Sequence, residues 1–93
     1  MALRVTLAGA TGWAGSAVAR GIARANDLEL VAAVARNAAG RPLGQALGEP
    51  LSAPVFATAT EALTVPCDIF VEFTKPDSAK GNVLAALAAG AHV

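Results

Sequence analysis

Three glycines at three-residue intervals are the first residues with a clear chemical use. Gly9, Gly12 and Gly15 stand in LAGATGWAGSAVARG, between an apolar run and a run with helical spacing. Where a strand turns into a helix, free backbone N–H groups and the helix dipole attract a diphosphate. Gly9 would turn the chain, Gly12 would admit the diphosphate, and Gly15 would bring the helix close to the sheet. The pattern predicts a dinucleotide-binding loop, and a tight turn that binds nothing is the alternative.

The second apolar run, LVAAV, is followed by Ala35 and Arg36, where dinucleotide-binding domains usually carry an acid for the adenosine ribose. The nearby acid, Glu29, comes too early in the run to serve there. Without a carboxylate at this point, the Arg36 guanidinium can hold a 2′-phosphate through charge-assisted hydrogen bonds. The sequence therefore favours NADPH over NADH, which stays possible. The alternative is that Arg36 and Arg41 are solvated loop residues.

Three further residues border the expected ligand site. Trp13 lies inside the glycine loop, where its indole would cover either a ligand or the protein's own surface. Phe73 and Thr74 stand in EFTKP after a β-rich run, on the ligand side of an open parallel sheet. Phe73 would form a wall of the site and Thr74 would hydrogen-bond the cofactor. The alternatives are that Thr74 caps a helix and that Glu72 is an ordinary strand-end acid.

No group of residues predicts a nucleophile, a general base or a metal site. Cys67 has no second cysteine and no ligand partners at metal spacing, and His92 is the single histidine. Cys67 is expected to be a small buried hydrophobe. The sequence thus supplies binding residues and predicts neither a catalytic residue nor a metal site.

The elements that must position these residues alternate along the chain. Apolar and β-rich runs predict strands at 3–8, 28–34, 55–57 and 68–73, and the start of a fifth at 91–93. Helical spacing predicts helices at 13–25 and 76–89 and helical turns at 43–47 and 60–63. Parallel strands need crossover connections, so this alternation predicts an α/β fold, a Rossmann-type doubly wound parallel sheet truncated after the start of its fifth strand.

Each long helix is expected to bury one apolar face. In the first helix the expected inner residues are Ala14, Ala17, Val18, Ile22 and Ala25. In the last helix, which begins at Pro76 and ends before Gly90, they are Ala79, Val83, Leu84 and Leu87.

Composition narrows the class of protein. In 93 residues, 55% are hydrophobic and 15% charged, which is typical of one small globular domain. Seven basic residues balance seven acidic ones, so nucleic acid and anionic membrane surfaces are not expected partners. The apolar runs at both ends are too short for a membrane span or a secretory signal. A soluble, cytoplasmic protein is expected.

Three stretches together resemble the N-terminal domain of dihydrodipicolinate reductase, namely VTLAGATGWAG, AAVAR and VEFTKPDSAKGNVLAALAAGAHV. The resemblance covers nearly the whole chain, and FTKP followed by the alanine-rich helix is its most specific part. It implies a dinucleotide-binding domain over residues 1–93 with the substrate domain absent. It also implies an NAD(P)H-dependent reductase of lysine and diaminopimelate biosynthesis, which delivers hydride to a cyclic dicarboxylate.

The resemblance implies which residues meet the cofactor. Arg36 would lie at the adenosine ribose, Phe73 and Thr74 nearer the nicotinamide, and the loop would consist of Gly9, Ala10, Thr11, Gly12, Trp13 and Ala14. The chain departs from the family twice, since Trp13-Ala14 replaces the common Arg-Met and Ala35 replaces the acid that often precedes the arginine. The family's paired histidines, lysine and Gly-Thr-Thr stretch are absent, so the chain alone is expected to be inactive and to meet a small-molecule substrate only with the missing domain.

Two other functions fit the same residues. One is a different dehydrogenase with a G-A-T-G-x-x-G loop, of the aspartate-semialdehyde or acyl-phosphate reductase type, which would carry a catalytic cysteine downstream. The other is a nicotinamide-sensing or oligomerising module without chemistry, since a fold does not dictate a function. A homo-oligomer is compatible with each of these functions.

Overall fold

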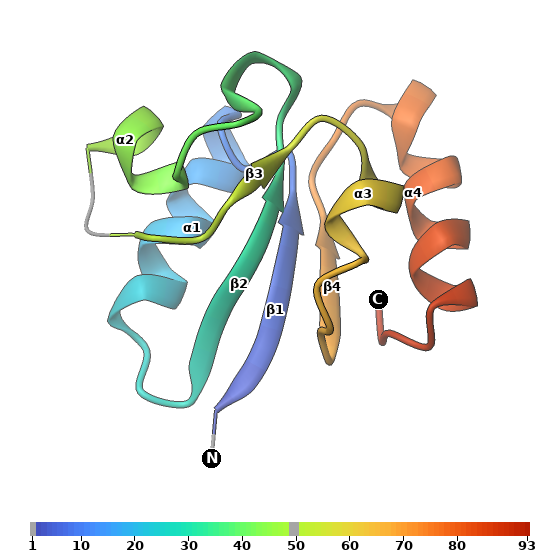
Figure 1. The fold of residues 1–93 in the computed structure, drawn as a ribbon, viewed down its shortest axis with the longest axis horizontal. Coiled ribbons are helices and arrows are strands. Elements are labelled where there is room, and N and C mark those ends of the chain that lie inside the picture. The colour runs from blue at the N-terminus through green and yellow to red at the C-terminus, as the bar shows by residue number, and fades with distance from the viewer. Residues whose placement is uncertain (1, 49–50) are drawn as a thin grey trace.

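The computed structural model describes residues 2–48 and 51–93. Its four strands form one parallel sheet in the order β3-β2-β1-β4 (Figure 1). The strands are β1 (Leu3–Ala8), β2 (Leu28–Val34), β3 (Val55–Phe56) and β4 (Ile69–Glu72). Because every neighbouring pair is parallel, all four carboxyl ends meet at one edge of the sheet.

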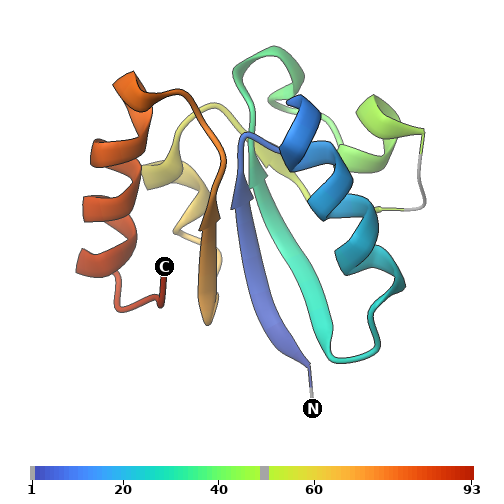
Figure 2. The same ribbon diagram turned by 180° about the vertical axis from the view of Figure 1, so that it is seen from behind.

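Helices cover both faces of this sheet, as Figures 1 and 2 show from opposite sides. One face carries α1 (Trp13–Arg24) and the short α2 (Leu43–Leu47), and the other carries α3 (Ala59–Ala62) and α4 (Pro76–Ala88). A 3-10 turn, η1 (Arg36–Ala38), follows β2. The arrangement is the Rossmann-type doubly wound sheet expected from the alternation of strands and helices.

Two apolar clusters, one on each side of the sheet, hold the layers together. Leu7, Ala33 and Val55 contribute to the cluster under α1 and α2, which also contains Ala19 and Leu43. The second cluster lies under α3 and α4 and consists of Ala8, Ala32, Val34, Ala59, Ala62, Phe70, Ala86 and Ala91. Successive strand residues such as Leu7 and Ala8 point to opposite faces, and both are fully buried. This two-sided burial explains why the strands read as continuous apolar runs.

The expected helices and the first four expected strands are present, with small shifts at their ends. The helix 13–25 ends at Arg24, and the helix 76–89 ends at Ala88. The strands 55–57 and 68–73 shorten to Val55–Phe56 and Ile69–Glu72, while the turn 60–63 becomes Ala59–Ala62 because Thr58 accepts a hydrogen bond from the Glu61 N–H and caps it. The predicted strand start at 91–93 amounts to one parallel bridge between His92 and Ile69.

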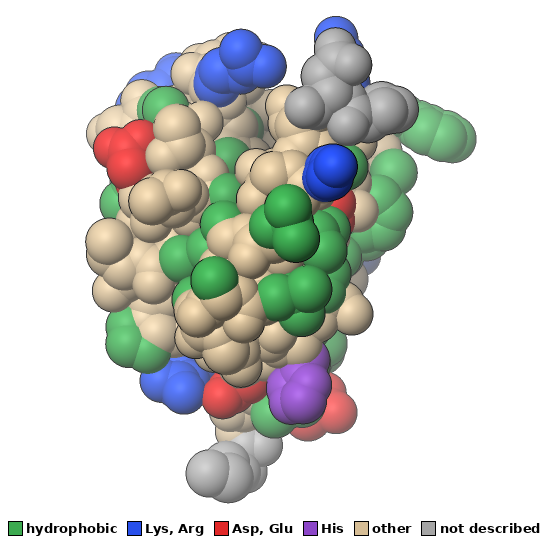
Figure 3. Space-filling model, turned by 90° about the vertical axis from the view of Figure 1, so that its right-hand side faces the viewer, with side chains coloured by type: hydrophobic (Ala, Val, Ile, Leu, Met, Phe, Trp, Pro, Cys, Tyr) green, Lys and Arg blue, Asp and Glu red, His purple; other side chains and the backbone are tan. Residues whose placement is uncertain are grey.

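The predicted inner face of α4 was wrong in part. Ala86 is its fully buried residue, whereas Leu84 and Leu87 are 57% and 56% exposed. Among the described residues nothing covers these two leucines, and Figure 3 shows apolar side chains gathered on this side of the molecule. A small residue lets the helix backbone approach the sheet closely, so the alanine side faces inward.

The inner face of α1 also differs from the expected one. Gly15, Ala19 and Ile22 are buried, while Ala14 and Ala17 are exposed. Gly15 faces the turn before the helix, where a Cβ would collide with the Gly9 backbone, so the buried side of α1 begins at this glycine.

No helix in the described part of the chain is long and apolar enough to cross a membrane. Cys67 is half-buried against the α3 and α4 cluster, as expected of a small hydrophobe.

Candidate functional site

The glycine loop joins β1 to α1 through close backbone contacts. Gly9 has φ 78°, and a Cβ on it would lie 2.5 Å from the Phe73 carbonyl oxygen. A Cβ on Gly15 would lie 1.9 Å from the Gly9 carbonyl oxygen. For Gly12 the closest such contact is 3.3 Å, so internal packing demands glycine less strictly there. Gly9 and Gly15 are therefore required by the fold, and Gly12 leaves backbone accessible at the start of α1.

The start of α1 has its positive end unneutralised. Gly12 is the N-cap, no side chain caps the helix, and the first turn contains no acid. The Ser16 N–H donates to the Gly12 carbonyl as the first intrahelical bond. The N–H groups ahead of it are the natural donors for an anion.

A cleft of about 810 Å³ opens beside this loop. Its walls come from the carboxyl ends of all four strands and from one side of α4. The lining residues are Gly9, Thr11, Gly12, Val34, Ala35, Arg36, Asn37, Ala57, Thr58, Ala59, Thr60, Phe73, Thr74, Lys75, Ser78, Gly81, Asn82 and Ala85. A ligand in an open parallel sheet is expected at this edge.

The cleft collects most of the residues singled out from the sequence. Gly9, Thr11, Gly12, Arg36, Phe73 and Thr74 all line it. Ala10 is fully buried beneath the loop, and Trp13 and Ala14 are exposed outside the lining. Trp13 is 96% exposed, so the alternative in which its indole packs on the protein's own surface is wrong for the described residues.

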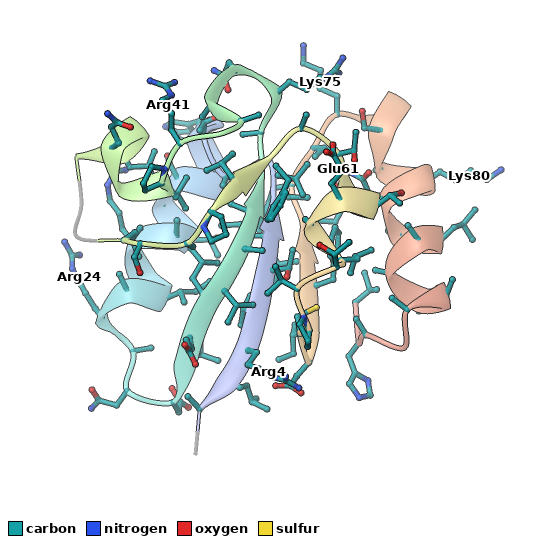
Figure 4. The ribbon with its side chains drawn as sticks, viewed as in Figure 1. Arg4, Arg24, Arg41, Glu61, Lys75 and Lys80 are labelled. Carbon is teal, nitrogen blue, oxygen red and sulfur yellow. The ribbon has the colours of Figure 1, made fainter. Side chains whose placement is uncertain are left out.

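Arg36 is the first residue of η1, and its exposed side chain borders the cleft. Beside it, the Thr11 hydroxyl donates to Asn37 Oδ1 at 3.1 Å and so links the glycine loop to the segment after β2. Arg41 donates from Nη2 to the Asn37 carbonyl at 3.2 Å. Figure 4 shows Arg41 and Lys75 at this same end of the molecule. Arg36, Arg41 and Lys75 thus bring positive charge, which attracts a phosphate, to the carboxyl edge of the sheet, where Glu72 is the strand-end acid.

On the far side of the cleft, the segment after β4 is organised by an acid. The Thr74 N–H donates to Glu72 Oε1 at 2.6 Å, and the Thr74 hydroxyl donates to the same oxygen. Asn82 Nδ2 lies 3.4 Å from Thr74 Oγ1. The N-cap of α4 is Lys75 and receives no side-chain cap, so the reading of Thr74 as a helix cap was wrong.

Sequence reasoning missed the α4 wall and the segment 57–60. Small or polar residues at Ser78, Gly81, Asn82 and Ala85 have the spacing i, i+3, i+4 and i+7, which is one helix face. That spacing was visible in the sequence. Among the described residues no group of three potential ligands could hold a metal ion.

The comparisons with known proteins agree on one relationship. A family model described as "Dihydrodipicolinate reductase, N-terminus" matches residues 3–93. The 4-hydroxy-tetrahydrodipicolinate reductase of Synechocystis sp. is 35% identical over 94 residues, covering 92% of this chain and 34% of that protein. The enzyme of the same name from Synechococcus elongatus is 38% identical over 96 residues, with the same coverages.

The fold has a solved counterpart. The structure titled "Dipicolinate bound Dihydrodipicolinate reductase" from Paenisporosarcina sp. superposes with a TM-score of 0.79 at 23% identity, over 98% of this chain and 36% of that one. At this identity the likeness speaks for the fold alone. The chain spans about a third of the length of the curated relatives it matches.

Proposed function

The chain belongs to the family of dihydrodipicolinate reductase N-terminal domains, and from that membership we propose that residues 1–93 bind a nicotinamide dinucleotide, NADPH in preference to NADH. The domain would serve a cytoplasmic reductase of lysine and diaminopimelate biosynthesis that acts on a cyclic dicarboxylate. When bound, the reduced nicotinamide supplies a hydride.

The uncapped start of α1, opening into the cleft at the carboxyl edge of the sheet, is the observation that carries this proposal. Its free N–H groups and helix dipole would hold the diphosphate over the loop 9–14. Gly12 would let the phosphates reach the backbone. A diphosphate fits these residues, since no acid opposes it in the first turn of α1.

The preference for NADPH rests on Arg36 and on the residue before it. Ala35 is buried and brings no carboxylate to the ribose, so nothing there repels a 2′-phosphate. The Arg36 guanidinium would receive that phosphate. Phe73 and Thr74 would border the cofactor on the side nearer the nicotinamide.

Catalysis would need more than this chain. No described side chain that lines the cleft is a histidine or a cysteine. We therefore expect the 93-residue chain to bind cofactor without turning over substrate, which would require the remaining two thirds of the relatives' length. The family match favours this reductase over a semialdehyde or acyl-phosphate reductase.

Titration of the purified chain with NADPH and NADH, followed by nicotinamide fluorescence, tests the proposal. NADPH should bind more tightly. A folded chain that binds neither dinucleotide at about 1 mM would contradict the proposal, because a specific cofactor site binds far more tightly than that.

Arg36→Asp should reverse the preference, because a carboxylate repels the 2′-phosphate and accepts from a ribose hydroxyl. NADPH affinity should fall about tenfold or more, the loss expected for a charge-assisted hydrogen bond. Arg24→Asp is the matched control, since Arg24 is an exposed residue at the other end of α1 (Figure 4). An unchanged NADPH to NADH ratio in the Arg36 variant would rule out the phosphate contact.

A further inference from the structure

Glu72 buries part of its carboxylate at a cost in free energy of folding, and the proposed function gives it no role. It is the last residue of β4, paired in register with Ala8. Its Oε1 accepts both hydrogen bonds from Thr74, while Oε2 is buried with no hydrogen-bond partner among the described residues. A carboxylate with one unsatisfied buried oxygen opposes folding. Stability therefore does not account for it.

The peptide between Phe73 and Thr74 is held from two sides. The Phe73 N–H donates to the Ala8 carbonyl at 3.0 Å, continuing the ladder with β1. Gly9 lies directly against this peptide, since a Cβ there would come within 2.5 Å of the Phe73 oxygen and 3.1 Å of the Thr74 nitrogen. Glu72 takes the Thr74 N–H from its other side. The acid thus holds the Thr74 N–H, while the Phe73 N–H and the close approach of Gly9 join the end of β4 to the glycine loop.

This arrangement decides what the Thr74 hydroxyl can offer a ligand. A hydroxyl has one proton and two lone pairs. The proton is donated to Glu72, with the Lys75 carbonyl as a second and longer acceptor at 3.4 Å, so it is engaged within the protein. One lone pair faces Asn82 Nδ2 at 3.4 Å. Both Thr74 and Asn82 line the cleft. The second lone pair of the Thr74 oxygen is left to accept a hydrogen bond, so this point in the cleft suits a ligand group that donates one.

We infer that Glu72 is a positioning residue, which orients Thr74 and tethers Asn82 so that this wall of the cleft receives a donor group of the nucleotide, a ribose hydroxyl or an amide N–H. A phosphate, which only accepts, finds no donor at the Thr74 oxygen and is left to the N–H groups of the glycine loop. The inference rests on the proposed function, because it assigns part of the same cleft.

Glu72→Gln tests the role with little change of shape. The amide oxygen can still accept from Thr74 but without charge, so both bonds weaken. NADPH affinity should fall about tenfold, the usual difference for a charged partner, while thermal stability stays the same or rises. A purely structural acid would lower stability instead. Glu29→Gln, on an exposed residue near the amino end of β2, is the matched control and should bind as wild type.

Two Thr74 variants separate the hydroxyl from the shape of the side chain. Thr74→Ser keeps the donor to Glu72 and should keep NADPH affinity, whereas Thr74→Val removes it and should lose about tenfold. The inference is overturned if Glu72→Gln binds NADPH within about twofold of wild type, or if the serine and valine variants bind equally.

The Thr74 amide proton gives a readout that needs no ligand. Loss of the carboxylate acceptor should move its NMR resonance upfield in Glu72→Gln. If the wild-type chain binds neither dinucleotide, the proposed function fails and this resonance decides the positioning role. A resonance that does not move overturns it.

Discussion

In the described part of the chain, two buried side-chain oxygens have no hydrogen-bond partner, and they differ in their relation to the cleft. Glu72 Oε2 lies beside a cleft, whereas Thr6 Oγ1 lies in the middle of β1 between Ala32 on β2 and Phe70 on β4. Thr6 is fully buried. Thr6 is not among the residues that line the cleft, so its unpaired hydroxyl destabilises the core without serving the site.

Thr6→Val should raise the free energy of unfolding by about 1 kcal/mol, because an isosteric methyl replaces an unpaired buried hydroxyl. Urea denaturation measures the change. Thr64→Val is the control, since the exposed Thr64 hydroxyl donates to the Glu61 carbonyl at 2.7 Å and its loss brings no gain. A Thr6 variant less stable than wild type would show that the hydroxyl has a partner.

Among the elements, α1 approaches the glycine loop closely at one residue, Gly15. Two glycines of this helix, Gly15 and Gly21, differ in the space around them. A Cβ on Gly15 would collide with the Gly9 backbone, while a Cβ on Gly21 would meet nothing within 4 Å. The helix is therefore docked at its first turn and free of that constraint two turns later.

Alanine substitution at these two positions should have opposite effects. Gly15→Ala should destabilise the fold by about 2 to 3 kcal/mol, because backbone rather than a flexible side chain must move. Gly21→Ala should stabilise it by about 0.5 to 1 kcal/mol through lower backbone entropy in the unfolded chain. Chemical denaturation followed by circular dichroism compares the pair. Equal effects would contradict the docking of α1 on the loop.

In the whole molecule, the ligand edge of the sheet carries Arg36, Arg41 and Lys75, and the opposite edge carries an ion pair. At the amino end of the sheet, Arg4 donates to Asp68 from its backbone N–H at 2.8 Å and from its guanidinium at 3.2 and 3.1 Å. The Asp68 N–H donates back to the Arg4 carbonyl at 2.8 Å. Hydrogen bonds from Arg4 hold the pKa of the Asp68 carboxyl below its ordinary value. The pair joins the starts of β1 and β4.

Stability should therefore fall in acid. Because the folded pKa of Asp68 is lower than the unfolded one, its stabilisation is complete above the unfolded pKa and is lost as the pH falls through the folded value. In Asp68→Asn and in Arg4→Gln, the melting temperature should therefore fall less than in wild type as the pH is lowered from about 5 to about 2. If the melting temperatures of the variants fall with pH as steeply as that of wild type, the Arg4–Asp68 pair does not contribute to stability in this way.

Much of the fold and part of the candidate site followed from the sequence alone. Strand and helix periods, the glycine triplet and Pro76 predicted the four strands and four α-helices to within a few residues, but not the 3-10 turn at Arg36–Ala38. These features are local, because backbone preferences and helix ends depend on residues close in the chain. The glycine loop, Arg36 and the FTKP stretch pointed to one edge of the sheet for the same reason: strand ends in a parallel sheet meet there.

Burial and side-chain partnerships were decided by the tertiary structure. Leu84 and Leu87 have the hydrophobicity of core residues, yet Ala86 faces the sheet. Ala10 and Trp13, three residues apart in one loop, lie at the two extremes of exposure. Glu72, Thr74 and Asn82 form one network from a strand, a turn and a helix. The sequence by itself determined the elements and the edge where a ligand would bind, since those follow from local periodicity and parallel pairing. Which side chains line that edge depends on how closely each helix approaches the sheet, and only the packed structure sets that distance.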